Sequence, residues 1–257
     1  MGPVVPSPRI WGVELIMMIP KIVHYCWFGG RPKPIDVVKY IKSWHIMLPD
    51  YEIKEWNESN FDVDAWLYAQ QAWRARKFAF VSDVARLHAL YQDGGVYLDT
   101  DVEVRRPFDA LMDYPVVLGF EEGEYIATST ILASPKSKLI GDFLSSYRDR
   151  RFCLDGGSLD QTTNVQVLTS ILAAHGLKRD GTRQQLQYKG ESVVVLERVA
   201  LSPIDYPNGI DHTSDGTFAV HHFGKSWASP RTRFRASLRR LAIRAIGGER
   251  LRRVRQS

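Results

Sequence analysis

Two aspartates that could bind a metal ion stand one residue apart, at Asp99 and Asp101 in the segment GGVYLDTDVEV. Two neighbouring carboxylates can share one hard divalent cation, and that cation can carry a diphosphate. The triplet alone is weak evidence, because a second Asp-x-Asp, Asp62 and Asp64, occurs in NFDVDAW. The elements around each triplet must therefore decide which of the two does chemistry.

The pattern of apolar residues predicts strands that alternate with helices. Strands are predicted at residues 21–28, 51–56, 96–104, 114–121, 127–134, 192–197 and 217–223. Helices are predicted at residues 34–48, within 62–92, at 138–150 and at 162–176. This alternation indicates an α/β fold with a mainly parallel central sheet.

The ends of the predicted strands separate the two triplets, because ligands of open α/β sheets bind beyond the carboxyl ends of the strands. Such ends carry Trp27 with Gly29-Gly30, Asp99 to Asp101, and His221-His222. Asp99 and Asp101 are expected two apart on one strand, where side chains face the same side. Asp62 and Asp64 precede AWLYAQQAW instead, where we expect them to cap and charge the start of a helix.

A second polar pair, Asp83 and Arg86, lies upstream in FAFVSDVARLHALYQDGG. On a helix, positions three apart share a face. The arginine could hold a phosphate or sugar hydroxyls while the aspartate orients it; the alternative is a surface ion pair.

Four segments, taken in order, resemble the DXD-containing sugar transferases of glycosyltransferase family 32 and, more distantly, the catalytic domain of the large clostridial glucosylating toxins. They are IPKIVHYCWFGG, SWHIMLPDYEIKEWNE, FAFVSDVARLHALYQDGGVYLDTD and HHFGKSW. The resemblance implies a single GT-A (Rossmann-like) domain, which we place at residues 19–230, and a divalent metal, Mn²⁺ or Mg²⁺. A shell of carboxylates and imidazole suits Mn²⁺ slightly better.

The resemblance also implies roles for the matching positions. Trp27, beside Gly29, would stack on the nucleotide base. Asp83 and Arg86 would hold the donor's ribose or sugar and its diphosphate, and Asp99 would contact the sugar or ribose. Tyr97 is expected either to line the donor pocket or to pack in the core. Asp101 would bind the metal, His221 or His222 would complete its shell (with His221 favoured), and Ser226 and Trp227 would lie near the β-phosphate. Asp160 to Asn164 fall where related enzymes meet donor sugar and acceptor, with a helix cap as the alternative.

The predicted activity is a metal-dependent, retaining transfer of a sugar from a nucleotide-sugar to a glycan or lipid-linked glycan of a cell-surface polysaccharide, such as capsule or lipopolysaccharide. A UDP-sugar is the favoured donor, and a GDP-mannose-dependent mannosyltransferase is the alternative. Two further classes stay open. One is a hydrolase that uses paired carboxylates. The other is a non-catalytic accessory protein that binds a membrane or a polyanion.

Charge is distributed unevenly along the chain. Ten Arg and one Glu give residues 231–257 a net charge of +9, against +5 for all 257 residues, so the remainder is mildly acidic at −4. Apolar residues of this segment recur at helical spacing, at Phe234, Leu238, Leu241 and Ala245. A basic amphipathic helix of this kind binds anionic lipid headgroups; a solvated tail is the alternative. We expect no nucleic acid partner, because no recognised nucleic-acid module accompanies the charge.

Composition gives a location for the predicted enzyme. The two cysteines, Cys26 and Cys153, form no disulfide framework, which fits a reducing cytoplasm. Residues 1–18 are expected to be an N-terminal extension, and they lack the basic leader of a secretory signal. With the basic tail, these features predict a cytoplasmic protein held at the inner face of a bacterial plasma membrane.

Overall fold

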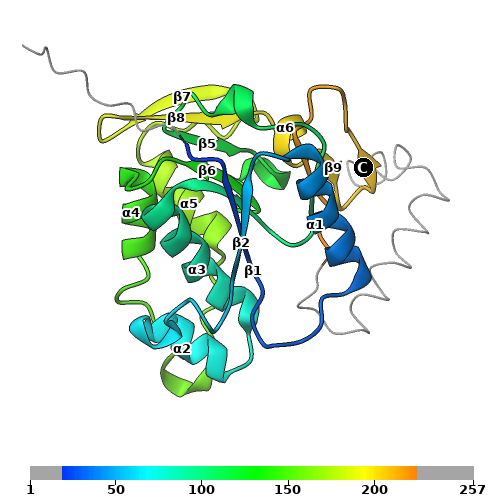
Figure 1. Ribbon diagram of the computed structural model, residues 1–257. Coiled ribbons are helices and arrows are strands. Elements are labelled where there is room, and N and C mark those ends of the chain that lie inside the picture. The colour runs from blue at the N-terminus through cyan, green and yellow to red at the C-terminus, as the bar shows by residue number, and fades with distance from the viewer. Residues whose placement is uncertain (1–18, 225–257) are drawn as a thin grey trace, which may run out of the picture.

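The computed structural model describes residues 19–224, and a seven-stranded sheet runs through their centre (Figure 1). The strand order is β2-β1-β3-β6-β5-β8-β7. The strands are β1 (Ile22–Cys26), β2 (Glu52–Trp56), β3 (Gly95–Leu98), β5 (Val116–Gly119), β6 (Thr130–Ala133), β7 (Gln184–Tyr188) and β8 (Glu191–Leu196). Of these, β7 was not predicted from the sequence.

Five of the seven strands point the same way. The pairs β1-β2, β1-β3 and β5-β8 are parallel, whereas β6 is antiparallel to both β3 and β5, and β7 is antiparallel to β8. Strands β2, β1, β3, β5 and β8 therefore share one direction, and their carboxyl ends meet at one edge of the sheet. The predicted α/β fold with a mainly parallel central sheet is confirmed, and this arrangement agrees with the GT-A expectation.

Helices cover both faces of the sheet (Figure 1). They are α1 (Ile35–Met47), α2 (Leu67–Arg74), α3 (Phe78–Asp93), α4 (Lys138–Ser145), α5 (Asn164–Ala173) and the short α6 (Arg198–Leu201). One apolar core joins Tyr97 of β3 to residues of α3, α4 and α5, and a second joins Val96 and Leu98 of the same strand to Trp44 of α1. Alternate side chains of a strand face opposite sides, so β3 is buried on both faces.

The predicted helical region 62–92 divides into three helices. A short 3₁₀ turn, η1 (Val63–Ala65), precedes α2 and α3. Asp62 caps this turn by accepting a hydrogen bond from the backbone N–H of Asp64 at 3.1 Å. The expectation that Asp62 and Asp64 cap and charge the start of a helix is therefore confirmed. At the far end, Gly94 and Gly95 both have positive φ (66° and 105°), and Gly94 ends α3.

The predicted strand 96–104 is wrong as a single element. Strand β3 ends at Leu98, the backbone turns at residues 99–101, and β4 (Val102–Val104) begins beyond the turn. Strand β4 leaves the central sheet and pairs antiparallel with β11 (Ala219–His221), so that His221 lies opposite Val102. The turn therefore joins two sheets, and it carries both aspartates.

Smaller elements complete the described residues: η2 (Asp109–Leu111), η3 (Glu122–Glu124), η4 (Asp155–Gly157), and the paired strands β9 (Ile204–Asp205) and β10 (Ile210–Asp211). The predicted extension 1–18, Ser226, Trp227 and the predicted basic helix at 231–257 lie outside the described residues. None of the helices within residues 19–224 combines the length and apolar character that a bilayer span requires.

Candidate functional site

The turn between β3 and β4 sets the two carboxylates. The backbone N–H of Val102 donates to the carbonyl of Asp99 at 3.0 Å, and the N–H of Asp99 donates to the carbonyl of Ser129 on the neighbouring chain segment at 2.8 Å. Asp99 and Asp101 consequently lie close together because of a turn, and not because of the two-residue period of a strand. The position is the carboxyl end of β3, as expected.

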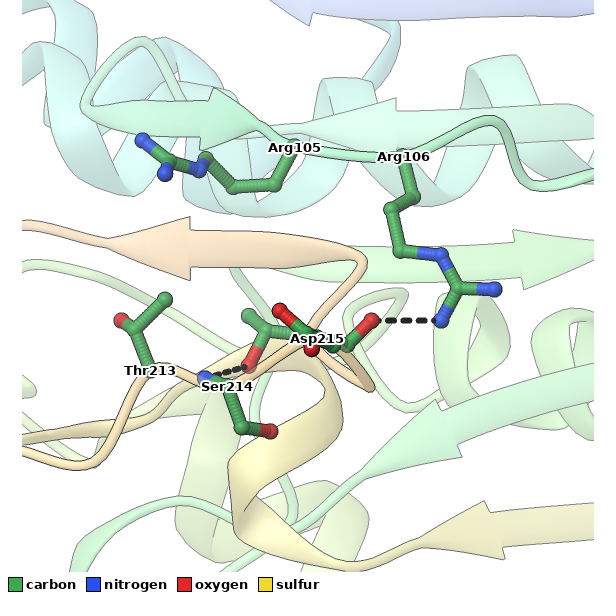
Figure 2. A pocket seen from close by; sticks show the side chains of 6 residues that line it. Arg105, Arg106, Thr213, Ser214 and Asp215 are labelled. Atoms are coloured by element: carbon green, nitrogen blue, oxygen red, sulfur yellow. Dashed lines mark hydrogen bonds between the residues drawn. The ribbon is translucent and has the colours of Figure 1, made fainter.

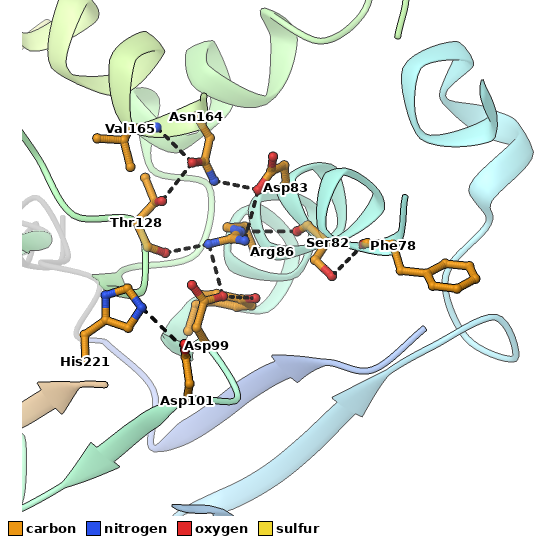
Figure 3. A network of polar contacts seen from close by, with 11 residues as sticks. Phe78, Ser82, Asp83, Arg86, Asp99, Asp101, Thr128, Asn164, Val165 and His221 are labelled. Atoms are coloured by element: carbon orange, nitrogen blue, oxygen red, sulfur yellow. Dashed lines mark hydrogen bonds and ion pairs between the residues drawn. The ribbon is translucent and has the colours of Figure 1, made fainter. Parts of the chain in front are cut away.

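His221 joins the two aspartates from the other end of the described chain. One ligand atom from each of Asp99, Asp101 and His221 lies within 4.8 Å of the others. Figure 3 shows His221 pointing toward Asp101, with 3.4 Å between Nε2 and Oδ1. Two backbone contacts fix this approach: the N–H of His222 donates to the carbonyl of Asp101 at 2.9 Å, and that of Gly224 donates to its Oδ2 at 2.7 Å.

The electrostatics of this cluster favour an ionised carboxylate. Burial alone would raise the pKa of Asp101, but the nearby His221 and the N–H of Gly224 lower that pKa to about 2. Burial alone would lower the pKa of His221, whereas the charges of Asp101 and Asp99 raise it. Asp99, Asp101 and His221 therefore bring two carboxylates and one imidazole together at the rim of the sheet.

The residues fit a divalent cation. Carboxylate oxygens and imidazole nitrogen are ligands that Mn²⁺ accepts, and Mg²⁺ favours the oxygens. The second imidazole nitrogen of His221, Nδ1, is buried and has no hydrogen-bond partner among residues 19–224. Asp99 and Asp101, with His221, would hold the metal.

His222, the other candidate ligand, points elsewhere. Its Nε2 lies 2.9 Å from Oε2 of Glu103, and its ring stacks on Tyr40 of α1 with 4.7 Å between ring centroids. The structure thus brings His221 into the acidic cluster and places His222 against α1.

The Asp83–Arg86 pair is buried next to the cluster, so it is no surface ion pair. Arg86, 5% exposed, donates to Oδ1 of Asp83 at 3.0 Å and to the carbonyl of Thr128 at 2.7 Å, and its Nη1 lies 3.3 Å from Oδ1 of Asp99 (Figure 3). Burial alone would lower the pKa of Arg86, but the charges of Asp99 and Asp83 raise it above its ordinary value. The guanidinium is therefore a fixed positive charge facing the cluster.

Asn164 holds Asp83 from the opposite side. Its side-chain nitrogen donates to Oδ1 of Asp83 at 2.6 Å, and its oxygen accepts from the hydroxyl of Thr128 at 3.0 Å. Burial raises the pKa of Asp83 to about 6, although Arg86 opposes that rise. The sequence placed Asp160 to Asn164 either near donor sugar and acceptor or in a helix cap. Thr163 caps α5 in the structure, which leaves the amide of Asn164 to contact Asp83.

Tyr97 is both a core residue and a contact of the cluster. Its ring is buried on β3, Arg86 lies 4.6 Å from the ring centroid, and its hydroxyl donates to Oδ1 of Asp99 at 2.9 Å. Tyr97 therefore orients Asp99, and its buried ring packs in the core.

Trp27 and Gly29 follow the carboxyl end of β1, the strand next to β3. The indole of Trp27 is half-buried and donates to the carbonyl of Arg31 at 2.6 Å. Gly29 has φ of +93°, its N–H donates to Glu58, and a Cβ there would come within 2.4 Å of the Phe78 ring. Only glycine combines this backbone conformation with such a close approach.

One acidic residue near the cluster escaped sequence reasoning. Glu121 follows the carboxyl end of β5, and burial raises its pKa to about 7, with His221 opposing the rise and Asp99 adding to it. Glu121 belongs to the run FEEGE, which contains three glutamates, and nothing in the sequence indicates which of them lies near the site. Its placement beside the cluster depends on the order of strands in the sheet.

A polar hollow of about 380 Å³ lies apart from these residues, and Figure 2 shows its lining: Arg105, Arg106, Thr213, Ser214, Asp215 and Thr217. Its two arginines are exposed, whereas Arg86 is buried; Arg105 pairs with Glu103 at 3.0 Å and Arg106 donates to the carbonyl of Asp215 at 2.9 Å. The buried cluster around Arg86 is the better candidate site, because its charges converge on one point.

Comparison with known proteins points to the part of the chain that holds Asp83, Arg86, Asp99 and Asp101. Residues 34–118, about a third of the chain, match the family described as "Glycosyltransferase sugar-binding region containing DXD motif". The chain is 37% identical over 101 residues to "Glucan organizing enzyme 1" of Cryptococcus neoformans, which covers 35% of this chain and 26% of that protein. It is 28% identical over 137 residues to "Inositol phosphoceramide mannosyltransferase 3" of Schizosaccharomyces pombe, covering 46% and 38%. The matches thus span well under half the length of these relatives.

Solved structures with similar architecture include the "PaToxG Glycosyltransferase", at 16% identity and a TM-score of 0.47 over 61% of this chain and 69% of that one. The galactosyltransferase LgtC, in complex with donor and acceptor sugar analogues, gives 15% identity and a TM-score of 0.43 over 87% and 95%. The resemblance to DXD-containing sugar transferases is confirmed for residues 34–118 by the family match.

Proposed function

We propose, from the premise that residues 34–118 carry a glycosyltransferase sugar-binding region, that this protein transfers a sugar from a nucleoside diphosphate sugar to a hydroxyl acceptor in a metal-dependent reaction. The observation that carries the proposal is the convergence of Asp99, Asp101 and His221 within 4.8 Å, at the edge of the sheet where the carboxyl ends of the parallel strands meet. The buried Arg86 lies 3.3 Å from Asp99 and adds a positive charge to the same place.

The reaction breaks the bond between the sugar and its diphosphate, so negative charge develops on the leaving group. A divalent cation at the cluster would neutralise part of that charge. Arg86 would neutralise more, and it needs no rearrangement to do so, because Asp83, Thr128 and Asp99 already hold its guanidinium. Asn164 and Asp83 would bind donor hydroxyls. We assign no protein nucleophile, and we expect the anomeric configuration to be retained.

The nature of the donor is the finer part of the proposal. A UDP-sugar with Mn²⁺ is the first candidate, with Trp27 stacked on the base and Gly29, Ser226 and Trp227 near the donor. Transfer of mannose from GDP-mannose is the second candidate, and it is favoured by two S. pombe relatives whose names are inositol phosphoceramide mannosyltransferases.

For the acceptor, we propose a glycan or lipid-linked glycan of a cell-surface polysaccharide, such as capsule or lipopolysaccharide. The location that goes with it is the cytoplasmic face of a bacterial plasma membrane, where the basic residues 231–257 would meet anionic lipid. The support is the charge of that segment, +9. We expect no nucleic acid partner.

A thermal-shift panel of UDP- and GDP-sugars, each with and without Mn²⁺, tests the function, since a ligand selective for the folded state raises its stability. We expect one donor class to raise the melting temperature only with Mn²⁺, and to be hydrolysed slowly under the same conditions. The variant Asp101→Asn should lose both responses. The matched control is Asp64→Asn in the other Asp-x-Asp, whose side chain accepts a hydrogen bond from Gln70 at the surface, and it should keep them.

Three results would count against the proposal. An Asp101→Asn protein that retains Mn²⁺-dependent donor hydrolysis would remove the metal assignment. Cleavage of glycosides without any nucleotide would favour the hydrolase, and a folded protein that responds to no donor would favour the accessory protein.

A further inference from the structure

The chain makes a left-handed turn two residues after the candidate metal ligand His221. Phe223 has φ of +51°, in a region of backbone conformation that residues other than glycine rarely adopt. Such a conformation costs free energy and persists only where the surrounding contacts hold it. The contacts that hold this turn are made by the residues on either side of Phe223.

Both neighbours of Phe223 are bound to Asp101. The backbone N–H of His222 donates to the carbonyl of Asp101 at 2.9 Å, and the N–H of Gly224 donates to its Oδ2 at 2.7 Å. A Cβ on Gly224 would lie 3.3 Å from the Cβ of Asp101, so the two residues pack closely. The turn at Phe223 lies between these two hydrogen bonds and bends the chain around Asp101.

The Phe223 ring lies against the imidazole of His221. The two ring centroids are 4.0 Å apart, and the ring planes are inclined by 32°. Tyr206, which follows β9, contacts the Phe223 ring in turn, with 5.3 Å between centroids. The loop that carries Tyr206 is closed by Asp205, which accepts from the backbone N–H and the side-chain nitrogen of Asn208 at 3.1 and 2.9 Å. Phe223 is therefore held between the candidate metal ligand and a second part of the chain.

His221 lacks a support that metal-binding histidines generally have. Such a histidine donates the N–H of its other ring nitrogen to an acceptor, and this hydrogen bond fixes the orientation of the ring. Nε2 of His221 faces Oδ1 of Asp101 at 3.4 Å, so Nδ1 is the other nitrogen. Nδ1 is buried and has no hydrogen-bond partner among residues 19–224. Within this part of the chain, the ring of Phe223 is in a position to orient the imidazole instead.

We propose that Phe223 is a positioning residue for the candidate metal site, and that its ring sets the orientation of the His221 imidazole toward Asp99 and Asp101. Contacting aromatic rings prefer particular relative orientations, so the packing restricts the imidazole. A ring that is already oriented loses less conformational freedom when a cation binds, and Phe223 thereby strengthens metal binding. The inference rests on the proposed function for the metal, and it gives Phe223 no contact with donor or acceptor.

Calorimetric titration of the full chain with Mn²⁺ alone tests this role. Phe223→Leu keeps an apolar side chain but removes the ring, and it should weaken Mn²⁺ binding about tenfold, the low end of the loss seen when an orienting partner of a metal ligand is removed. Phe223→Gly should weaken Mn²⁺ binding to a similar extent, because glycine adopts the left-handed turn readily and leaves the backbone in place. Phe223→Tyr keeps the ring and should bind Mn²⁺ like the parent.

The control replaces a phenylalanine just before strand β11, which carries His221 at its other end. Phe218 is also half-buried, and its ring stacks on Phe108 with 6.4 Å between centroids. Phe218→Leu should bind Mn²⁺ like the parent. Melting temperatures measured with chelator present separate positioning from folding. In chelator, Phe223→Leu should melt no lower than Phe218→Leu, although only Phe223→Leu loses affinity for Mn²⁺.

The positioning role is overturned if Phe223→Leu or Phe223→Gly binds Mn²⁺ as tightly as the parent, because the ring is then not needed. It is also overturned if Phe223→Leu melts well below Phe218→Leu in chelator, since the loss of affinity then reflects a weakened fold. A parent that binds no Mn²⁺ would overturn the metal dependence of the proposed function as well. A parent that binds Mn²⁺, together with an unaffected Phe223→Leu, would overturn the positioning role alone.

Discussion

Replacing Asp83 with asparagine tests two separate effects of its carboxylate: the contribution to donor binding and the effect on the free energy of unfolding. The amide is nearly the same size as the carboxylate, and its oxygen can still accept from Arg86 and Asn164, as Oδ1 does now at 3.0 and 2.6 Å. What the change removes is the ability to ionise. We therefore expect Asp83→Asn to abolish donor binding and, at neutral pH, to make the protein more stable.

The size of the effect follows from the shifted pKa. Burial raises the pKa of Asp83 from 3.8 to about 6, with Arg86 opposing the rise. Because the folded-state pKa is above the unfolded one, the folded chain keeps a proton that the unfolded chain releases between pH 4 and 6. Stability associated with this carboxyl is present below pH 4 and is lost as pH rises through that window. A shift of about 2 units corresponds to about 3 kcal/mol of unfolding free energy.

Urea unfolding of the parent and Asp83→Asn, in parallel from pH 4.5 to 7.5 with chelator present, measures this difference. The free energy of unfolding of the variant should exceed that of the parent by an amount that grows with pH and levels off above pH 6, near 3 kcal/mol. Titrating groups that do not interact with Asp83 cancel in the comparison. A difference that does not change with pH would refute the reasoning, because Asp83 would then be as well solvated as in the unfolded chain.

Three further changes test other parts of the site. His221→Gln should weaken Mn²⁺ binding at least about tenfold in calorimetry, because losing even a residue that orients a metal ligand costs about 10–100-fold. His222→Gln should leave Mn²⁺ binding unchanged; the reverse order would exchange the two roles. Gly29→Ala should lower the free energy of unfolding by about 1–3 kcal/mol in chemical denaturation, because its φ of +93° and the nearby Phe78 ring strain any side chain there; an unchanged denaturation midpoint would mean that the loop can move. Tyr97→Phe should keep the fold but reduce Mn²⁺-dependent donor binding several-fold in the thermal-shift titration, because it removes the 2.9 Å hydrogen bond from Tyr97 to Asp99. Full donor affinity in this variant would mean that Tyr97 only packs in the core.

The turn at Asp99 to Asp101 shows what the sequence could and could not predict. The apolar residues on both sides of the triplet gave the pattern of one strand, which was wrong. The position of the triplet was predicted correctly, at a strand end and at the edge of the sheet where the carboxyl ends of the parallel strands meet. The break itself comes from tertiary pairing, since β4 finds its partner in β11, more than a hundred residues away. No local pattern reports such a partner.

Two other differences have similar causes. Strand β7 reads QQLQY, in which only Leu186 and Tyr188 are apolar; they alternate with glutamines and pack on the core. Two apolar residues are too few to mark a strand, and β7 lies at the edge of the sheet, supported only by β8. Asn164 is the first residue of α5, and the sequence placed it either near donor sugar and acceptor or in a helix cap. Its contact with Asp83 depends on how α5 and α3 come together, and the two residues are 81 positions apart.

The contact between Gly224 and Asp101 spans 123 positions of the chain, and this has a consequence for synthesis. Closing so long a loop carries an entropic cost that strand β11 must offset when it docks on β4. The carboxylates emerge from the ribosome long before the imidazole that lies beside them. A nascent chain that stops before His221 therefore holds only Asp99 and Asp101 of the three proposed cation ligands, and the site is complete only after β11 has been made and has docked.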